Sequence, residues 1–408
     1  MPMMTFRARV EPPVMASLLL LATACTGVLD VENSRDILTE DLNRPEAVPA
    51  IVSGVAGDYA ATFMHAALVT GYSSNELQHV GSATGWRELE NGFADNQGAA
   101  GTVFNNASRA LFVADNAAER LKTLIPDWES RVEAARVRIY GGFTMLLLAD
   151  NFCRITIAGG APITPAQTYE RAESHFTEAL AIATKANATA QQQQAIAGRA
   201  RARLMVGKFA AARDDAKLIP RNFRFQAIYS QNSSRENNDL ATSTVRTIRK
   251  EGSVYPAYYR DARYKSDPRT PFIDRGPTEV GADAIRQYVE QRKYPAREAL
   301  ANIATWQQAR LIEAEAELKL GNVARAVELI NEVRAAATPA LLAYTGPTAA
   351  DAVLQQLLYE RSAEMWLEAQ RYLDLKRTND PFLADRVKCY QLSFAEEQSN
   401  PNVKPANQ

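Results

Sequence analysis

The sequence predicts a mostly α-helical fold, in which a framework of helical hairpins carries an inserted, irregular and loop-rich subdomain. Apolar residues recur at helical spacing through most of residues 105–219 and again after residue 301. Two of these helical stretches share one pattern of small residues and glycine. Between them, residues 220–300 are repeatedly interrupted by proline and rich in Tyr, Arg and Asp, so no long helix fits there. Short strands are expected over 223–229 and 244–248.

The amino terminus is typical of a secreted protein. Basic residues precede the apolar run 14–21, and small residues lead from it to Cys25. This pattern predicts a signal peptide over residues 1–24 and resembles a bacterial lipobox, in which the new terminal cysteine carries acyl chains. Plain secretion is the alternative. Residues 25–43 are polar and acidic and are expected to form a tether.

Residues 44–219 are expected to form an N-terminal helical region. Helices are predicted over 45–70, 105–124 and up to about 151. Ser130 with Glu133, and Thr164 with Gln167, have the spacing of capping boxes that open two further helices. Adjacent glycines at 141 and 142 inside a helical pattern indicate close packing between helices.

A glycine-rich loop is predicted over residues 71–103, between the first two helices. It contains the aromatic residues Tyr72, Trp86 and Phe93. Such a segment costs conformational entropy to order, so it is either disordered or a binding loop. Trp86 is the best single candidate for a ligand contact.

The shared pattern indicates hairpins of the tetratricopeptide type, in which alanines let two helices approach and glycine turns the chain. The strict landmarks of a tandem 34-residue repeat are missing. The residues at matching offsets are Ala202, Leu204, Gly207 and Ala212 in one stretch and Ala316, Leu318, Gly321 and Ala326 in the other.

The last region, residues 301–408, is expected to hold a helical pair and a closing tail. One continuous helix is predicted over 353–378. It carries a row of glutamates that is either a solvated face or a charged set answered by nearby cations. The row is Glu360, Glu364 and Glu368, and the cations are Arg361, Arg371, Lys376 and Arg377.

This helix resembles the C-terminal helix of the RagB/SusD family of nutrient-uptake lipoproteins. Residues 313–316, the Asn-Pro-Asn segment 400–402 and the tripeptide 267–269 are also similar to family segments. At residues 367–370 the family often has a glycine-containing turn that is absent here. The residues that fit the helix pattern are Glu360, Arg361, Glu364, Arg371, Tyr372, Asp374, Leu375 and Arg377.

The resemblance implies a SusD-like outer-membrane lipoprotein, held in lipid through Cys25. It would capture a nutrient, such as an oligosaccharide, and deliver it to a SusC-like TonB-dependent transporter barrel. Residues 220–300 would face the ligand. A flat aromatic ring can stack on a sugar, but each loop aromatic can equally belong to the core. The candidates are Trp86, Tyr72, Tyr258 and Tyr259.

Other classes of function lack support in the sequence. A formal net charge of -1 gives no electrostatic footprint for nucleic acid. The histidines have no metal-ligand spacing, and no cofactor or catalytic motif is found. We therefore expect no enzyme, cofactor or metal. The rival interpretations are a periplasmic tetratricopeptide scaffold that binds proteins and, third, a lipid-anchored hydrolase.

Two cysteines remain if Cys25 carries lipid. In an oxidising compartment Cys153 and Cys389 are either bridged or two buried free thiols.

Overall fold

The computed structural model describes residues 41–403 of the 408-residue chain. The contacts divide the chain into residues 1–44 and residues 45–408. Of the first unit, only a single turn (η1, Asp41–Asn43) and Arg44 are described. The predicted signal peptide, Cys25 and most of the predicted tether lie outside the described residues.

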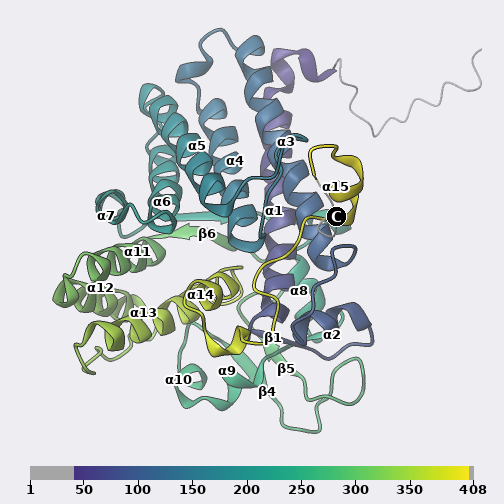
Figure 1. Cartoon of the computed structure of the whole chain (residues 1–408), viewed down its shortest axis with the longest axis vertical. Coiled ribbons are helices and arrows are strands. Elements are labelled where there is room, and N and C mark those ends of the chain that lie inside the picture. Colours follow the sequence, from purple (N-terminus) through teal and green to yellow (C-terminus); the bar gives the residue numbers. More distant parts are fainter. Residues whose placement is uncertain (1–40, 404–408) are drawn as a thin grey trace, which may run out of the picture. The chain divides into compact units, whose positions relative to one another are not determined.

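The second unit is mostly helical, as predicted (Figure 1). Its N-terminal helices are α1 (Val48–Ser73), α2 (Thr84–Glu90), α3 (Ala99–Leu124), α4 (Val132–Asn151), α5 (Pro165–Lys185), α6 (Thr189–Met205) and α7 (Phe209–Lys217). Three short helices follow, α8 (Asp239–Thr244), α9 (Pro256–Arg260) and α10 (Ala262–Lys265). The C-terminal helices are α11 (Trp306–Lys319), α12 (Val323–Ala336), α13 (Ala350–Glu364), α14 (Arg371–Arg377) and α15 (Phe394–Ser399). Single 3-10 turns are η2 (Pro45–Ala47), η3 (Trp128–Ser130), η4 (Ser234–Glu236) and η5 (Pro381–Leu383).

The strands form two-stranded antiparallel pairs. They are β1 (Leu77–His79) with β3 (Gly252–Val254), β2 (Arg224–Ala227) with β6 (Ala301–Thr305), and β4 (Phe272–Asp274) with β5 (Val289–Gln291). The strand predicted near 223–229 is confirmed by β2. The strand predicted over 244–248 is wrong, because Asn238 caps α8 and its last residue is Thr244.

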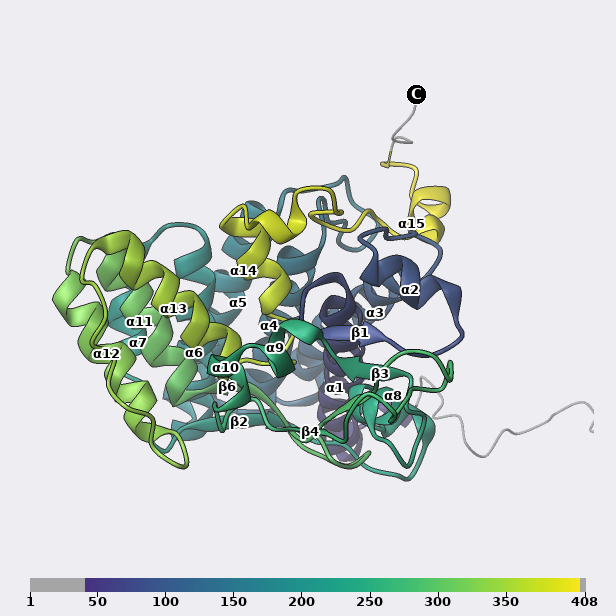
Figure 2. The same cartoon turned by 90° about the horizontal axis from the view of Figure 1, so that it is seen from below.

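The two stretches with matching spacing are hairpins, as predicted. Gly207 and Gly321 form the turns with φ of 76° and 86°, a left-handed conformation that glycine adopts without steric cost. The pairs are distant in sequence but adjacent in space. Helix α7 packs directly on α11, and Ala212 and Ala316 are fully buried between them. Figure 2 shows α6, α7, α11, α12 and α13 grouped at one end of this unit.

Close helix packing explains the glycines at 141 and 142. A Cβ at Gly142 would lie 2.7 Å from the Phe176 ring, and one at Gly198 would lie 2.3 Å from it. The capping box of Thr164 and Gln167 is confirmed at the start of α5. The one expected at Ser130 and Glu133 is wrong, because Ser130 belongs to η3 and α4 starts without a side-chain cap.

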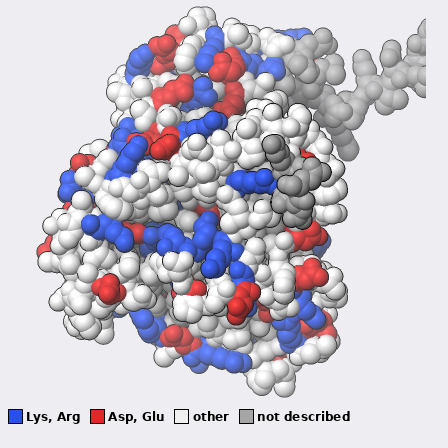
Figure 3. Space-filling view, viewed as in Figure 1, with Lys and Arg blue, Asp and Glu red and all other residues white. Residues whose placement is uncertain are grey.

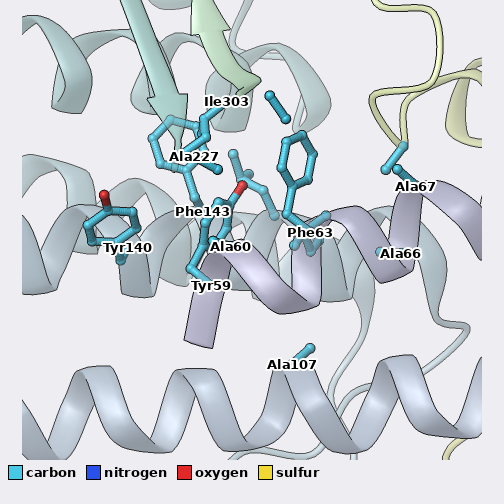
Figure 4. Packing of buried hydrophobic residues seen from close by; sticks show 14 of the residues in the cluster. Tyr59, Ala60, Phe63, Ala66, Ala67, Ala107, Tyr140, Phe143, Ala227 and Ile303 are labelled. Atoms are coloured by element: carbon cyan, nitrogen blue, oxygen red, sulfur yellow. The ribbon is translucent and has the colours of Figure 1, made fainter. Parts of the chain in front are cut away.

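Helix α1 runs through the core. It is long and apolar enough to cross a membrane by composition, but it packs against α3, α4 and α8 here. In Figure 4, Tyr59 and Phe63 of α1 lie beside Phe143 of α4, under Ala227 of β2 and Ile303 of β6. The ring centroids of Tyr59 and Phe63 are 5.7 Å apart. Helix α1 therefore contacts both the helical frame and the β2–β6 strand pair at which the inserted region begins and ends.

The single helix predicted over 353–378 is wrong. Helix α13 ends at Glu364 and α14 begins at Arg371. Leu367 and Ala369 between them have φ of 59°, so a left-handed turn separates the two helices although neither residue is glycine. The Leu367 amide donates to the Glu76 carboxylate at 2.8 Å, which supports this turn.

The glutamate row is not a solvated face. Glu360 is completely buried and Glu368 is 1% exposed. Lys293 pairs with Glu368 at 2.8 Å, and Arg334 with Glu360 at 2.6 Å. The neutralising cations thus come from other segments, which sequence spacing could not show.

Candidate functional site

A buried ion network joins the inserted region to the C-terminal helices. Arg269, whose side chain is 8% exposed, binds both carboxylate oxygens of Asp267, at 2.9 and 2.7 Å. The same guanidinium reaches Glu360 of α13 at 2.7 Å and Glu364 at 3.8 Å. Tyr359, next to Glu360, donates its hydroxyl to Asp267 at 2.8 Å. These contacts fix residues 267–269 against α13.

The network holds Arg269 and Asp267 charged despite burial, whereas burial raises the pKa of Glu364. Burial alone would lower the pKa of Arg269, but the carboxylates of Asp267 and Glu360 outweigh it and raise that pKa above its usual range. Burial alone would raise the pKa of Asp267, but Arg269 outweighs it and lowers that pKa below 3.8. The bidentate pairing of Arg269 with Asp267 favours one arrangement of this segment.

Two polar cavities lie beside this network, and they are described together. Their volumes are about 490 and about 360 Å³, and they share the lining residue Ser266. The first lies along the α10–β4 segment of the inserted region, and the second between that segment, α13 and the loop after α12. Side chains that line the two cavities include Arg263, Lys265, Ser266, Asp267, Phe272, Asp274, Arg334, Tyr344, Gln356 and Tyr359. We call this set the 266 cleft.

Stacked aromatic rings support the 266 cleft from below. Trp366 stacks on Tyr258 with ring centroids 5.6 Å apart. Tyr258 lies 4.3 Å from Tyr264, and Tyr264 lies 5.0 Å from Tyr359. The Arg263 guanidinium covers the Tyr359 ring at 3.7 Å. Since Trp366 and Tyr258 are buried, the position of Tyr359 is set by the core.

The chemistry of the 266 cleft suits a neutral, polyhydroxylated ligand. Arg263 and Lys265 offer donors and Asp274 offers acceptors, whereas the Gln356 amide already binds Arg263 and Glu360. Half-buried Phe272 and Tyr344 add apolar rings. Within residues 41–403, no group of His, Cys, Asp and Glu could hold a metal ion.

The aromatic residues predicted to face a ligand lie elsewhere. Tyr72 belongs to α1 and is 1% exposed, and Tyr258 and Tyr259 of α9 are 1% and 7% exposed. These three rings are core residues in this structure, where packing partners cover their faces. Trp86 of α2 is half-buried, against Tyr72 at 5.3 Å between ring centroids. The four residues do not line the 266 cleft.

Sequence analysis missed Tyr359, Tyr344 and Arg263. The only available signal was the tripeptide Asp267–Arg269, similar to a family segment, and Glu360 in the helix motif. These two motifs meet in the network. Tyr359 and Arg263 are their neighbours in sequence, so the pairing of motifs locates the site.

The closing segment is fastened beside the helical frame. A disulfide joins Cys153 to Cys389, with 5.1 Å between their Cα atoms. The Asn400 side-chain amide donates to Gly160 O at 3.0 Å, and the Asn402 side-chain amide to Gly159 O at 2.8 Å. The Asn-Pro-Asn segment therefore holds the tail on the loop after α4.

Comparisons with known proteins agree with this architecture. Residues 310–404 match the model of the SusD family. No curated protein sequence matched. Among solved structures, a SusD superfamily protein from Bacteroides vulgatus is similar, with 15% identity, a TM-score of 0.65, and 89% of this chain and 98% of that chain covered. A SusD-like carbohydrate-binding protein from Bacteroides fragilis has 13% identity, a TM-score of 0.65 and coverage of 83% and 86%. A SusD homologue from Bacteroides thetaiotaomicron has 14% identity, a TM-score of 0.64 and coverage of 82% and 86%.

The structural likeness carries the fold across most of the chain, and the family match covers the segment with the buried glutamates and the Asn-Pro-Asn tail. Residues 310–404 of this chain therefore match the SusD family, and its fold across most of the chain is SusD-like.

Proposed function

We propose that this chain is a non-catalytic binding protein that captures an oligosaccharide nutrient at the cell surface and passes it to a TonB-dependent outer-membrane transporter. The match of residues 310–404 to the SusD family supports the nutrient-binding role, and two similar structures are described as carbohydrate-binding proteins. The lipobox-like sequence before Cys25 supports a lipid anchor in the outer membrane.

The observation that carries the proposal is the composition of the 266 cleft. Sugar hydroxyls both donate and accept hydrogen bonds, and a pyranose also has an apolar face. Asp274 and Lys265 match the hydroxyls, and the Tyr344 and Phe272 rings match the apolar face. The network below keeps the walls in place, so binding loses little energy to ordering them.

Trp86 is a second place where a sugar could stack. It is half-buried, and the adjacent Arg87 donates to Gly81 O at 3.0 Å and lies 3.6 Å from Asp283. A long oligosaccharide needs several contacts, so Trp86 is tested together with the cleft.

The test measures binding of a panel of oligosaccharides by calorimetry. Tyr344→Ala should weaken binding of any positive glycan by about tenfold, which is the loss expected for one stacking ring and its hydroxyl. The control is Phe112→Ala, which removes an exposed aromatic ring (61%) of α3 that does not line the 266 cleft. If Trp86→Ala weakens glycan binding and Tyr344→Ala does not, the binding site lies at α2. If the wild-type chain binds no glycan of the panel, the carbohydrate role is refuted.

The anchor and the partner need separate tests. Cys25→Ser should abolish incorporation of labelled fatty acid and release the protein from outer membranes. A TonB-dependent barrel should co-purify with the wild-type chain from detergent extracts. Recovery of a soluble periplasmic protein in place of a barrel would favour a tetratricopeptide scaffold.

A further inference from the structure

A second cavity lies in the helical frame, away from the 266 cleft. It has a volume of about 480 Å³, within the range of small-molecule sites. Residues of α4, α6, α7, α11 and α14 line it together with both disulfide cysteines. Its walls are mainly apolar and include Ala149, Phe152, Leu204, Met205, Phe209 and Leu373.

More cationic side chains than carboxylates line this cavity. Lys319, Lys376, Arg377 and Glu315 line it. Arg377 is fully engaged, since it pairs with Glu315 and with Asp374. Neither lysine forms an ion pair with a carboxylate in the part of the chain that is described.

Lys376 is a half-buried cation without a carboxylate ion-pair partner among the described residues. Its ammonium donates to the backbone carbonyl of Asp150 at 2.6 Å. The Asp150 carboxylate is already taken by Arg201 and by the hydroxyl of Tyr169. Burial lowers the pKa of Lys376, because charge is costly where water is excluded. An added anion would remove part of that cost.

The protein surface around this cavity is also positively charged. In Figure 3, Lys and Arg side chains form a band across this face, over the region where Figure 1 places α11 and α14. Lys319, in the last turn of α11, is exposed. A negatively charged head group approaching the cavity mouth would therefore meet favourable charge.

We propose that this cavity binds a small amphipathic carboxylate, with its aliphatic body against Leu204, Met205 and Leu373 and its head group at Lys319 and Lys376. Oligosaccharides are a poor match, because the polar lining consists mainly of cations and provides few acceptors for hydroxyl donors. The site is separate from the 266 cleft and does not depend on the proposed glycan function.

The proposal requires both halves of the ligand. Each methylene that leaves water strengthens binding about fourfold, so octanoate should bind about 15-fold more tightly than hexanoate. Octanamide has the same body without the charge and should bind more weakly than octanoate. Acetate has the charge without the body and should show no binding.

The experiment is calorimetric titration of the full chain with octanoate, hexanoate, octanamide and acetate. Lys319→Gln should weaken octanoate binding about fivefold, as for a partly exposed charge pair, and should leave octanamide binding unchanged. The control is Lys388→Gln, which removes an exposed lysine that does not line the cavity. Met205→Trp places a larger side chain at the wall and should abolish binding, with circular dichroism confirming that the variant is folded.

Equal affinity for octanoate and octanamide would overturn the proposal, and so would equal weakening by Lys319→Gln and Lys388→Gln. No octanoate binding by the wild-type chain would overturn it as well. Each outcome is independent of glycan binding, which is measured with the Tyr344 and Trp86 variants.

Discussion

Glu76 is a buried carboxylate that should make the stability of this protein depend on pH. One of its oxygens accepts from the Leu367 amide at 2.8 Å, and its backbone carbonyl accepts from the Tyr255 amide at 2.9 Å. The other oxygen, Oε2, is buried without a hydrogen-bond partner among the described residues. Burial raises the pKa of Glu76 from 4.5 to about 7, against the lowering effect of the Leu367 amide, Arg371 and Lys293.

The size of the effect follows from the two pKa values. One pKa unit corresponds to about 1.4 kcal/mol, so the difference between 4.5 and about 7 is worth about 3 kcal/mol. Below pH 4.5 the carboxyl is neutral in both the folded and the unfolded chain, and its folded form is not penalised. As the pH rises through about 7, the folded chain must ionise a buried group, and this stability is lost.

The perturbation is Glu76→Gln, which keeps an acceptor for the Leu367 amide but cannot ionise. Urea unfolding between pH 4.5 and 8.5 gives the free energy of unfolding for both proteins. The two should agree at pH 4.5, and the variant should be more stable by about 3 kcal/mol at pH 8.5. The difference between the wild-type and variant free energies of unfolding at each pH removes the contributions that histidines and other carboxylates make to both proteins. A difference that does not change with pH, or a variant that is less stable at pH 8.5, would refute the reasoning, because Arg371 and Lys293 would then keep Glu76 ionised.

Three further predictions use the same unfolding assay. Ala369→Gly should stabilise the chain by about 0.5–1 kcal/mol, because glycine adopts the left-handed conformation of this turn without steric cost. Leu367→Gly should destabilise the chain, because the Leu367 side chain is fully buried and its packing would be lost. Equal effects of the two variants would contradict the strain argument. Gly198→Ala should cost about 1–3 kcal/mol, because its Cβ would lie 2.3 Å from an aromatic ring, whereas Gly54→Ala in α1 meets open space and should not destabilise. Cys389→Ser should cost about 2–5 kcal/mol, because the disulfide closes a long loop; no change under oxidising conditions would show that the bridge adds nothing.

Features set by local sequence could be predicted. The left-handed turns at Gly207 and Gly321 and the cap at Thr164 depend on residues a few positions away. Helical periodicity likewise found α3 and α4 because their apolar faces pack in the core. Spacing alone could not show that the two hairpins are adjacent, since α7 and α11 meet through tertiary packing.

The break between α13 and α14 was hidden by side-chain identity. Leu367 and Ala369 are good helix formers, and only the surrounding core and the Glu76 contact hold them in a left-handed turn. Sequence composition also made Tyr258 look like a loop aromatic, although it stacks under Trp366 from a distant segment.

The candidate site depended even more on long-range contacts. Arg263 and Tyr359 are far apart in sequence and meet because Arg269 bridges Asp267 to Glu360. Each motif can be recognised in the sequence by itself, but the sequence does not show that residues 267–269 contact Glu360 in the folded protein.

The pairing of β2 with β6 closes the inserted region at its base. The chain leaves the helical frame at Ala227 and returns at Ala301, and these residues are direct partners in the strand pair. Such partners lie only about 5 Å apart, so the excursion begins and ends at one point of the frame. Between its ends the region is tied again, where β3 pairs with β1 and where Arg269 binds Glu360. A change of length in the loops between these ties would leave both ends of the region, and with them the helices, in place.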